Sequence, residues 1–181
     1  MKEQTFGKYY LGKSNTAAYA LLLVSIFLPG RIMNPLYIYG DSGVGKTHLL
    51  RAVQHTERLL IPRRRATYNT ARELCDELVK SIQSGEMCRM DETRYLGADI
   101  VMIDDMQHFV GKIATQNLIS QMLLALCDRN QKVIMAGDRP LEKFPVLYDR
   151  MRTQSRSLRE VRIHLPDRKI RKKMLRKKWK R

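Results

Sequence analysis

The sequence has few of the residues that build metal centres and covalent cross-links. It contains three cysteines and four histidines among 181 residues, without a C-x-x-C pair or a histidine cluster. Zinc sites and disulfide frameworks need such residues at close spacing, so the sequence supports neither and is typical of a reducing cytoplasm. We therefore expect a cytoplasmic protein, and we interpret the scattered histidines as packing or surface residues rather than ligands.

A long apolar segment is also missing. The most apolar run, residues 17–28, follows the basic start of the chain and superficially imitates a secretory signal. It is shorter than the roughly 20 residues that a transmembrane helix needs. Ser14 and Asn15, both helix N-cap types, precede it, so we predict a buried helix at this position. We predict no targeting segment, no membrane partner, no internal repeat and no flexible linker.

The positive charge is concentrated near the carboxyl end. The chain has a net charge of +16, and residues 156–181 carry thirteen lysines and arginines against two acids. Such a charge is typical of proteins that bind nucleic acid or an anionic surface, although a solvated terminal helix is an equal alternative. From this segment we expect nucleic-acid contacts by Arg171, Lys172 and Lys173.

Residues 36–50, LYIYGDSGVGKTHLL, carry the most specific motif. A β-prone run, a G-x-x-x-x-G-K-T loop and an apolar helix start follow one another, as in a P-loop, and this context disfavours a chance match. Backbone N–H groups of such a loop surround a polyphosphate at a helix N-terminus. We expect Lys46 to reach the β- and γ-phosphates and Thr47 to ligate Mg²⁺. The predicted phosphate-binding residues are Gly40, Gly43, Val44, Gly45, Lys46 and Thr47.

A second motif, IVMIDD at residues 100–105, is an apolar strand that ends in two carboxylates. Sheets of α/β proteins bind ligands at the carboxyl ends of their strands. We predict that Asp104 holds Mg²⁺ through water and that Asp105 orients or deprotonates an attacking water. A pair of exposed acids without a catalytic role is the alternative, which the order of the two motifs disfavours.

Strands and helices alternate along the chain. This pattern predicts an α/β P-loop NTPase fold in which helices cover a five-stranded parallel sheet. The predicted strands are residues 36–39, 66–68, 100–103, 133–136 and 161–165. Between the third and fourth strands, we expect a helix that begins at Thr115. We expect one domain over residues 1–181, with an N-terminal segment and helix (1–34), a P-loop core (35–165) and a basic C-terminal helix (166–181).

Four segments carry a family resemblance. They are TFGKYYLGKSN at residues 5–15, NPLYIYGDSGVGKTHLL at 34–50, ADIVMIDDMQHFVGK at 98–112 and GDRP at 137–140. In sequence, order and interval they resemble the ATPase domain of bacterial chromosomal replication initiators, the DnaA family of AAA+ proteins. Helicase loaders of the DnaC and IstB type share the GKTHL stretch, but we do not expect the GKSN element in them. The resemblance implies the AAA+ base subdomain and covers nearly the whole chain.

The resemblance also implies how a nucleotide is held. ATP or ADP with Mg²⁺ would be the cofactor, and Tyr9, Gly12 and Asn15 would lie against the adenine. Asp138, after the fourth strand, would occupy the sensor position that reads the γ-phosphate and would assist catalysis together with Asp105.

Thr70 and Glu73 form a predicted capping box, so we expect a helix to begin near Thr70, with Leu74, Leu78, Val79 and Ile82 as its apolar stripe. For DNA, the resemblance implies a surface on this helix. This helix corresponds to the initiator-specific insertion, where Val79 and Lys80 match the face that binds single-stranded DNA. Lys112 is a further expected contact. The basic contact expected two residues later is replaced by Ala114.

Other positions depart from the family pattern. Gln154 stands where the initiators have an arginine finger, with Arg152 and Arg156 beside it but out of register. The chain also ends at Arg181, where the family continues into a helical lid and later a duplex-reading domain. We therefore expect an ATP-binding replication-initiator-like module, with at most weak ATPase activity, that assembles in a nucleotide-dependent way and contacts single-stranded DNA. A non-hydrolysing adaptor of the initiator, a helicase-loader-like protein and a fragment that binds nucleic acid through its tail alone are the alternatives.

Overall fold

The computed structural model describes residues 3–27, 32–83, 95, 97–155, 157–168, 170–172 and 174. Its centre is a sheet of five parallel strands in the order β2-β3-β4-β1-β5. The strands are β1 (Leu36–Tyr39), β2 (Ala66–Thr70), β3 (Ile100–Asp104), β4 (Lys132–Gly137) and β5 (Arg159–Arg162). The predicted five-stranded parallel sheet is thereby confirmed.

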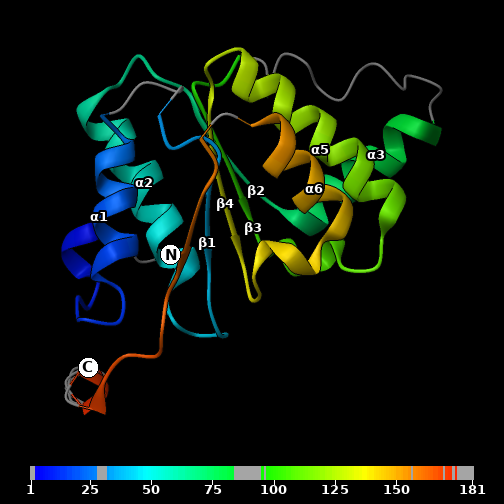
Figure 1. The fold of residues 1–181 in the computed structure, drawn as a ribbon. Helices are drawn as coiled ribbons and strands as arrows, with labels where there is room; N and C mark the ends of the chain where they lie inside the picture. Colours follow the sequence, from blue (N-terminus) through cyan, green and yellow to red (C-terminus); the bar gives the residue numbers. More distant parts are fainter. Residues whose placement is uncertain are drawn as a thin grey trace.

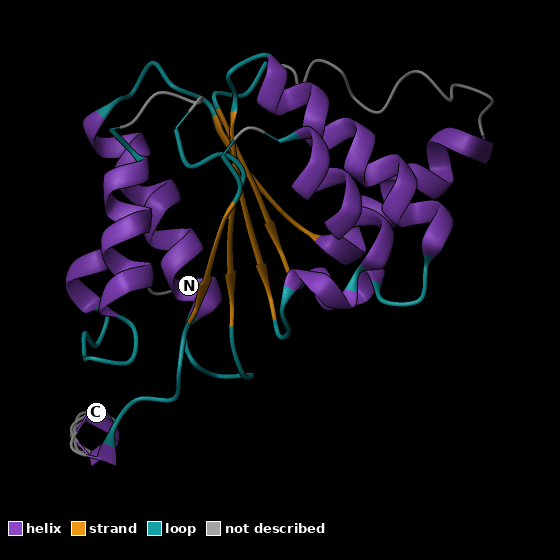
Figure 2. Cartoon of the chain, viewed as in Figure 1, coloured by secondary structure: helices purple, strands orange, loops and turns teal. Residues whose placement is uncertain are grey.

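Helices cover both faces of this sheet, which gives three layers (Figures 1 and 2). On one face lie α1 (Thr16–Ser25) and α2 (Lys46–Leu60). The other face is covered by α3 (Ala71–Gln83), α5 (Ile113–Asp128) and α6 (Pro145–Gln154). Short 3-10 helices are η1 (Phe6–Lys8), η2 (Met106–Phe109) and η3 (Leu141–Lys143). In the part of the chain described here, no helix is long and apolar enough to cross a bilayer.

The sheet separates two apolar cores. In β1, Tyr37 packs with the α3, α5 and α6 layer, while Leu36 and Ile38 pack with α1 and α2. All residues of β3 and β4 are buried. Strands covered on both faces must be apolar throughout, which explains why IVMI and VIMA show no alternation with polar residues.

The carboxyl ends of the strands meet at one edge of the sheet. The P-loop follows β1, Asp104 ends β3, and Asp138 follows β4 directly. Because all strands run in the same direction, these segments lie together at the lower edge in Figure 1. The fold thus gathers predicted site residues that are far apart in the sequence.

Several predicted boundaries are wrong. The fifth strand lies at residues 159–162 rather than 161–165; it is the edge strand beside β1, and its charged residues hide the usual alternation. The helix expected to begin at Thr115 begins at Ile113. Helix α6 was not predicted, and it is a short helix with few apolar residues that begins at Pro145.

Two predicted apolar faces are also corrected. We expected the helix at residues 17–28 to be buried, but the helix ends at Ser25 and only one of its faces is buried: Ala18 and Leu22 are fully buried, whereas Val24 exposes 47% of its surface. Val79, which the sequence places among the apolar residues of α3, is 51% exposed. It follows Leu78 by one residue, and one residue turns a helix by about 100°, so Val79 leaves the buried stripe of Leu74 and Leu78. The capping box is confirmed, since Thr70 N–H donates to Glu73 (2.7 Å) and Glu73 N–H donates to Thr70 Oγ1 (3.2 Å).

The C-terminal segment returns to the N-terminal segment. His164 N–H donates to the Ser14 carbonyl at 3.1 Å, and Asp167 Oδ1 accepts from Ile170 N–H at 2.8 Å in a helix N-cap. The Ile170 side chain lies so close to Gly12 that a Cβ on residue 12 would overlap the Ile170 side chain. The tail therefore packs beside the GKSN element in addition to carrying charge.

Candidate functional site

The P-loop is shaped by glycine. Gly45 precedes the first residue of α2 with φ of 98°, a conformation that side chains rarely adopt. A Cβ on Gly45 would also lie 2.7 Å from Cε2 of Tyr9. The Tyr9 hydroxyl donates to the Val44 carbonyl at 3.2 Å, so the ring rests directly on the loop backbone.

Lys46 is held inside the loop by backbone oxygens. Its side chain is 8% exposed, and Nζ donates to the carbonyls of Gly40 (2.7 Å) and Asp41 (3.0 Å). Burial lowers the pKa of Lys46, and the charges of four nearby carboxylates oppose that shift. The four are Asp104, Asp138, Asp105 and Asp41. The structure thus brings the predicted lysine and the predicted carboxylates together.

Asp104 is buried at the end of β3, with 1% of its surface exposed. Its Oδ1 accepts from the Asp105 N–H at 2.9 Å, and its Oδ2 accepts from the Tyr68 hydroxyl at 2.7 Å. The guanidinium of Arg51 lies 3.4 Å above the centre of the Tyr68 ring. Burial raises the pKa of Tyr68, and the hydrogen bond to Asp104 adds to the rise, so the hydroxyl stays protonated and donates.

Sequence reasoning missed Tyr68 and Arg51. The available signal was the short strand predicted at residues 66–68, because a strand that pairs with β3 must carry side chains beside Asp104.

Asp105 has a strained backbone. Its φ of 58° is left-handed, a conformation that is uncommon for a residue other than glycine and that recurs at functional sites. Gln107 Nε2 donates to its Oδ1 at 2.9 Å. Gln107, part of the IDD-x-Q element, therefore sets the direction of the second carboxylate.

Asp138 is engaged by its neighbour in the sequence. Arg139 donates from Nε to Oδ1 (2.6 Å) and from a terminal nitrogen to Oδ2 (3.0 Å). These hydrogen bonds hold the pKa of Asp138 below its usual value. The Arg139 carbonyl accepts from the buried Tyr37 hydroxyl at 2.6 Å, which anchors the turn after β4. No sequence pattern predicted a role for Arg139.

The predicted adenine-side residues have different surroundings. Tyr9 packs on the P-loop, and burial raises the pKa of Tyr9 to about 12. Asn15 is 2% exposed and bonds its own loop, with Oδ1 accepting from Gly12 N–H (2.9 Å) and Nδ2 donating to the Tyr10 carbonyl (3.0 Å). Gly12 is packed against Ile170. Of the three predicted adenine-side residues, Asn15 therefore shapes the GKSN turn, and Tyr9 contacts the P-loop.

A magnesium ion fits the oxygen donors at this edge. The Thr47 hydroxyl and the Asp104 carboxylate are hard oxygen ligands of the kind that Mg²⁺ prefers. Among the described residues there is no group of three or more His, Cys, Asp or Glu that could hold a metal ion. An ion at Thr47 and Asp104 would therefore take its other ligands from phosphate and water, as is usual for Mg²⁺.

The predicted nucleic-acid contacts fall into two separate groups. Val79 and Lys80 are exposed on α3. Cys75 lies one turn before Val79 on the same helix, and burial raises the pKa of its thiol. The charge of Lys112 opposes this rise, so Lys112 is close to Cys75. Lys112 therefore lies beside α3. Arg171 and Lys172 are exposed. The C-terminal segment that carries them lies on the far side of the molecule from α3 (Figure 1). Lys173 lies outside the described residues.

Gln154, at the position where the family has an arginine finger, is exposed. Gln154 and Arg152 both lie in the last turn of α6 with exposed side chains, and the Arg152 guanidinium is 6.0 Å from the Tyr148 ring centre. Arg156 lies outside the described residues.

Residues 1–158 match the family model described as the bacterial DnaA ATPase domain. The chain belongs to this DnaA family. Membership accounts for the GKSN, P-loop and IDD-x-Q elements together, and it confirms the resemblance and the AAA+ P-loop fold expected from the sequence.

Relatives of known sequence or structure agree. The chain is 34% identical over 174 residues to the chromosomal replication initiator protein DnaA of Symbiobacterium thermophilum, covering 96% of this chain and 38% of the relative. It is also similar to domain III of the Thermotoga maritima initiator, with a TM-score of 0.88, 30% identity, and coverage of 98% of this chain and 73% of that one. A replication initiator DnaA bound to AMPPCP and single-stranded DNA gives a TM-score of 0.85 with 28% identity, covering 99% of this chain and 55% of that one. The chain thus spans a little over a third of the length of the curated relative.

Proposed function

We propose that the chain binds ATP or ADP with magnesium at the carboxyl edge of its sheet and acts as the nucleotide-binding module of a replication initiator. One observation carries the proposal: Lys46 is buried inside a P-loop, near enough to the carboxylates at the ends of β3 and β4 for their charges to act on its ammonium group. A DnaA relative with a similar fold binds the ATP analogue AMPPCP, which supports the same use of this site.

The geometry assigns each residue a task. The N–H groups from Gly43 to Thr47 surround the phosphates, and Lys46 exchanges its two carbonyl partners for the β- and γ-phosphate oxygens. Thr47 would hold magnesium directly and Asp104 would hold it through water, and the ion would neutralise charge on the phosphates. Asp105, oriented by Gln107, accepts a hydrogen bond from the water that attacks the γ-phosphate.

The adenine is proposed to lie near the GKSN turn. Tyr9 supplies the aromatic surface nearest to the loop, and Tyr19 and His48 support its ring at centroid distances of 6.2 and 5.3 Å. Gly12 and Asn15 hold the backbone of the turn against the base. Nucleotide binding would therefore be sensed by the segment on which Ile170 packs.

The α3 surface is proposed to bind single-stranded DNA. Val79 offers an exposed apolar contact, and Lys80 and Lys112 supply positive charge, the combination that sequence-tolerant strand binding uses. The DnaA relative bound to single-stranded DNA supports this choice of partner. Self-assembly through neighbouring nucleotide sites belongs to the same proposal.

A second function, that of a non-hydrolysing adaptor, is favoured by Gln154. A neutral side chain at the finger position cannot stabilise charge on a neighbour's γ-phosphate, so a chain of this kind would bind nucleotide without efficient turnover.

The experiment that tests the proposal is nucleotide binding by the wild type and by Lys46→Ala. We expect the variant to lose most of its affinity for ATP and ADP, because the phosphates lose their buried cation. Lys143→Ala, which removes an exposed lysine in η3, serves as the matched control and should bind like the wild type. Equal affinities for the wild type and Lys46→Ala would refute the proposed site.

A further inference from the structure

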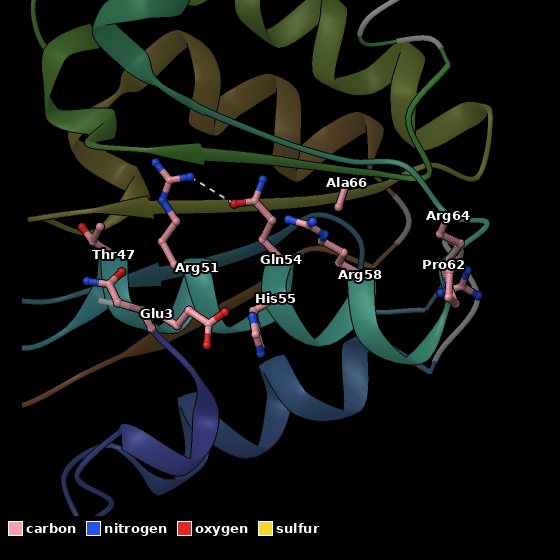
Figure 3. Close-up of a pocket in the computed structure, with 10 residues that line it drawn as sticks. Glu3, Thr47, Arg51, Gln54, His55, Arg58, Pro62, Arg64 and Ala66 are labelled. Carbon is pink, nitrogen blue, oxygen red and sulfur yellow. Dashed lines mark hydrogen bonds between the residues drawn. The ribbon is translucent and has the colours of Figure 1, made fainter. Parts of the chain in front are cut away.

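A groove of about 1050 Å³ runs beside α2 and extends away from the P-loop (Figure 3). Helix α2 forms one wall, and the turn from Pro62 to Ala66, the first residue of β2, forms another. Glu3 and Gln4 of the N-terminal segment complete the lining. Its polar lining includes Thr47, Arg51, Gln54, His55, Arg58 and Arg64. Thr47 belongs to the nucleotide site proposed above and Arg51 supports Tyr68 beside it, whereas Gln54, His55, Arg58 and Arg64 have no task there.

One face of α2 supplies most of the lining. Thr47, Arg51, Gln54 and Arg58 follow one another at intervals of four, three and four residues, which places them along a single helical face. In Figure 3, Arg51, Gln54 and Arg58 extend from α2 toward the sheet, while Thr47 lies at one end of the row. The groove therefore begins at the magnesium side of the P-loop and continues as a row of donors.

The positive charge in the groove is poorly neutralised by the chain itself. Arg51 stacks on the Tyr68 ring and donates to the neutral Gln54 at 3.0 Å. In the described part of the chain, Arg58 makes no side-chain hydrogen bond or ion pair. Glu3 is the acid that lines the groove.

Among the described residues, Arg64 is the groove arginine that has an acidic partner, and the two groups are 3.5 Å apart. Its guanidinium lies 3.5 Å from Glu57 Oε1 and donates to the Ile26 carbonyl at 2.8 Å. Glu57 is fully buried, and burial raises the pKa of its carboxyl. The groove thus presents three guanidinium groups against little opposing charge.

We propose that this groove binds the sugar–phosphate backbone of a single nucleic-acid strand. Guanidinium groups donate in a fork that matches phosphate oxygens. Arg51 and Arg58 are seven residues apart, about 10 Å along the helix, which corresponds to about three nucleotide rises of a stacked strand. A positively charged groove that follows the backbone is the usual way to hold a single strand.

The contacts are with phosphate rather than with bases. The described lining of the groove contains no Phe, Tyr or Trp, and Arg51 already occupies one face of the Tyr68 ring. Binding in the groove should therefore depend little on sequence. The site is distinct from the α3 surface, which lies on the opposite face of the sheet (Figure 1).

An acidic protein segment fits the groove less well. Protein interfaces rely on buried aromatic or aliphatic anchors, whereas the apolar lining of the groove consists of Pro62 and Ala66. Phosphate needs only the charge and the donors that are present.

The test measures binding of a labelled single-stranded oligonucleotide to the full chain over a range of salt concentrations. Arg58→Gln should reduce the slope of log K against log salt by about 0.7, and Arg51→Gln combined with Arg58→Gln by about 1.4. Arg129→Gln, an exposed arginine at the end of α5, is the matched control and should keep the wild-type slope. Thermal melting verifies that each variant is folded.

Several results would overturn the assignment. Wild-type slopes for both groove variants would place strand binding elsewhere. A second contrary result is that poly-glutamate displaces the oligonucleotide as well as unlabelled strand does, with Arg58→Gln weakening that displacement. This result would make the groove a site for acidic protein segments. A duplex that binds as tightly as the single strand and loses the same slope in Arg58→Gln would contradict the single-strand geometry.

Discussion

The carboxyl edge of the sheet and the basic C-terminal segment carry charge in different ways. At the edge, each charged group has partners within the chain: Lys46 bonds two carbonyls, Asp104 bonds Tyr68, and Asp138 bonds Arg139. Arg171 and Lys172 are exposed near the C-terminus. Groups held in fixed positions can select a ligand by its shape, whereas exposed charges act mainly through a screened field.

The difference teaches where specificity comes from in this chain. The edge is built from segments that the sheet brings together, so its selectivity depends on the fold. The tail acts through composition, and its binding should fall steeply with salt and vary little with sequence. The following changes separate the two regions.

The largest expected effect concerns turnover. If the finger position is inactive, ATPase activity per chain should stay constant as the protein concentration rises, because an arginine finger contributes about 10³-fold or more and Gln154 cannot replace it. Steady-state ATPase assays over a wide concentration range measure this. Steep concentration dependence that disappears in Arg152→Gln would show that the neighbouring arginine on α6 acts as the finger.

A smaller effect is expected for the hydroxyl beside Asp104. Tyr68→Phe keeps the ring under Arg51 but removes the donor to Oδ2, and loss of such an outer hydrogen bond typically lowers metal affinity by about 10- to 100-fold. A magnesium titration of nucleotide binding should shift by that amount, while binding in the presence of a chelator stays unchanged. Tyr148→Phe, on α6, is the matched control. An unshifted titration would mean that Tyr68 only fills space.

The smallest effect is the acid dependence of the Asp138–Arg139 pair. The pKa of Asp138 is lowered in the folded chain, so the pair contributes stability above the unfolded carboxyl pKa of about 3.9 and loses it as the pH falls through the lower folded pKa. Because both side chains are partly exposed, the contribution at neutral pH should be at most about 1 kcal/mol. Denaturant unfolding of the wild type and Arg139→Gln measures it. A difference that persists at the lowest pH would contradict the ionic origin.

The sequence predicted the features that depend on local pattern. The P-loop, the IVMIDD strand and the helix cap at Thr70 each occupy a few adjacent residues whose spacing is decisive, and the fold class follows from their order. Val79 was assigned both to the apolar stripe of α3 and to its DNA-binding face, because its apolar character was considered and its angular position on the helix was not.

The remaining features depend on contacts across the sheet. Tyr68 reaches Asp104 across 36 positions of sequence, and the groove exists because α2 packs beside the edge strand β2. The edge strand β5 is mostly charged and lacks an alternation of apolar and polar residues, so the sequence could not predict where it begins and ends. Such neighbours become visible only when the order of the strands is known.

The most direct test of the comparison measures ATP affinity and DNA affinity in the same two variants. Lys46→Ala removes the buried cation, and Arg171→Gln with Lys172→Gln removes exposed charge while leaving Ile170 on Gly12. We predict that the first variant loses ATP and keeps the salt slope of duplex binding. The second should keep ATP and lose about 0.9 of slope for each phosphate contact removed. If Lys46→Ala retains wild-type ATP affinity, or if neutralising the tail leaves the slope unchanged, the division between a built site and an electrostatic tail is wrong.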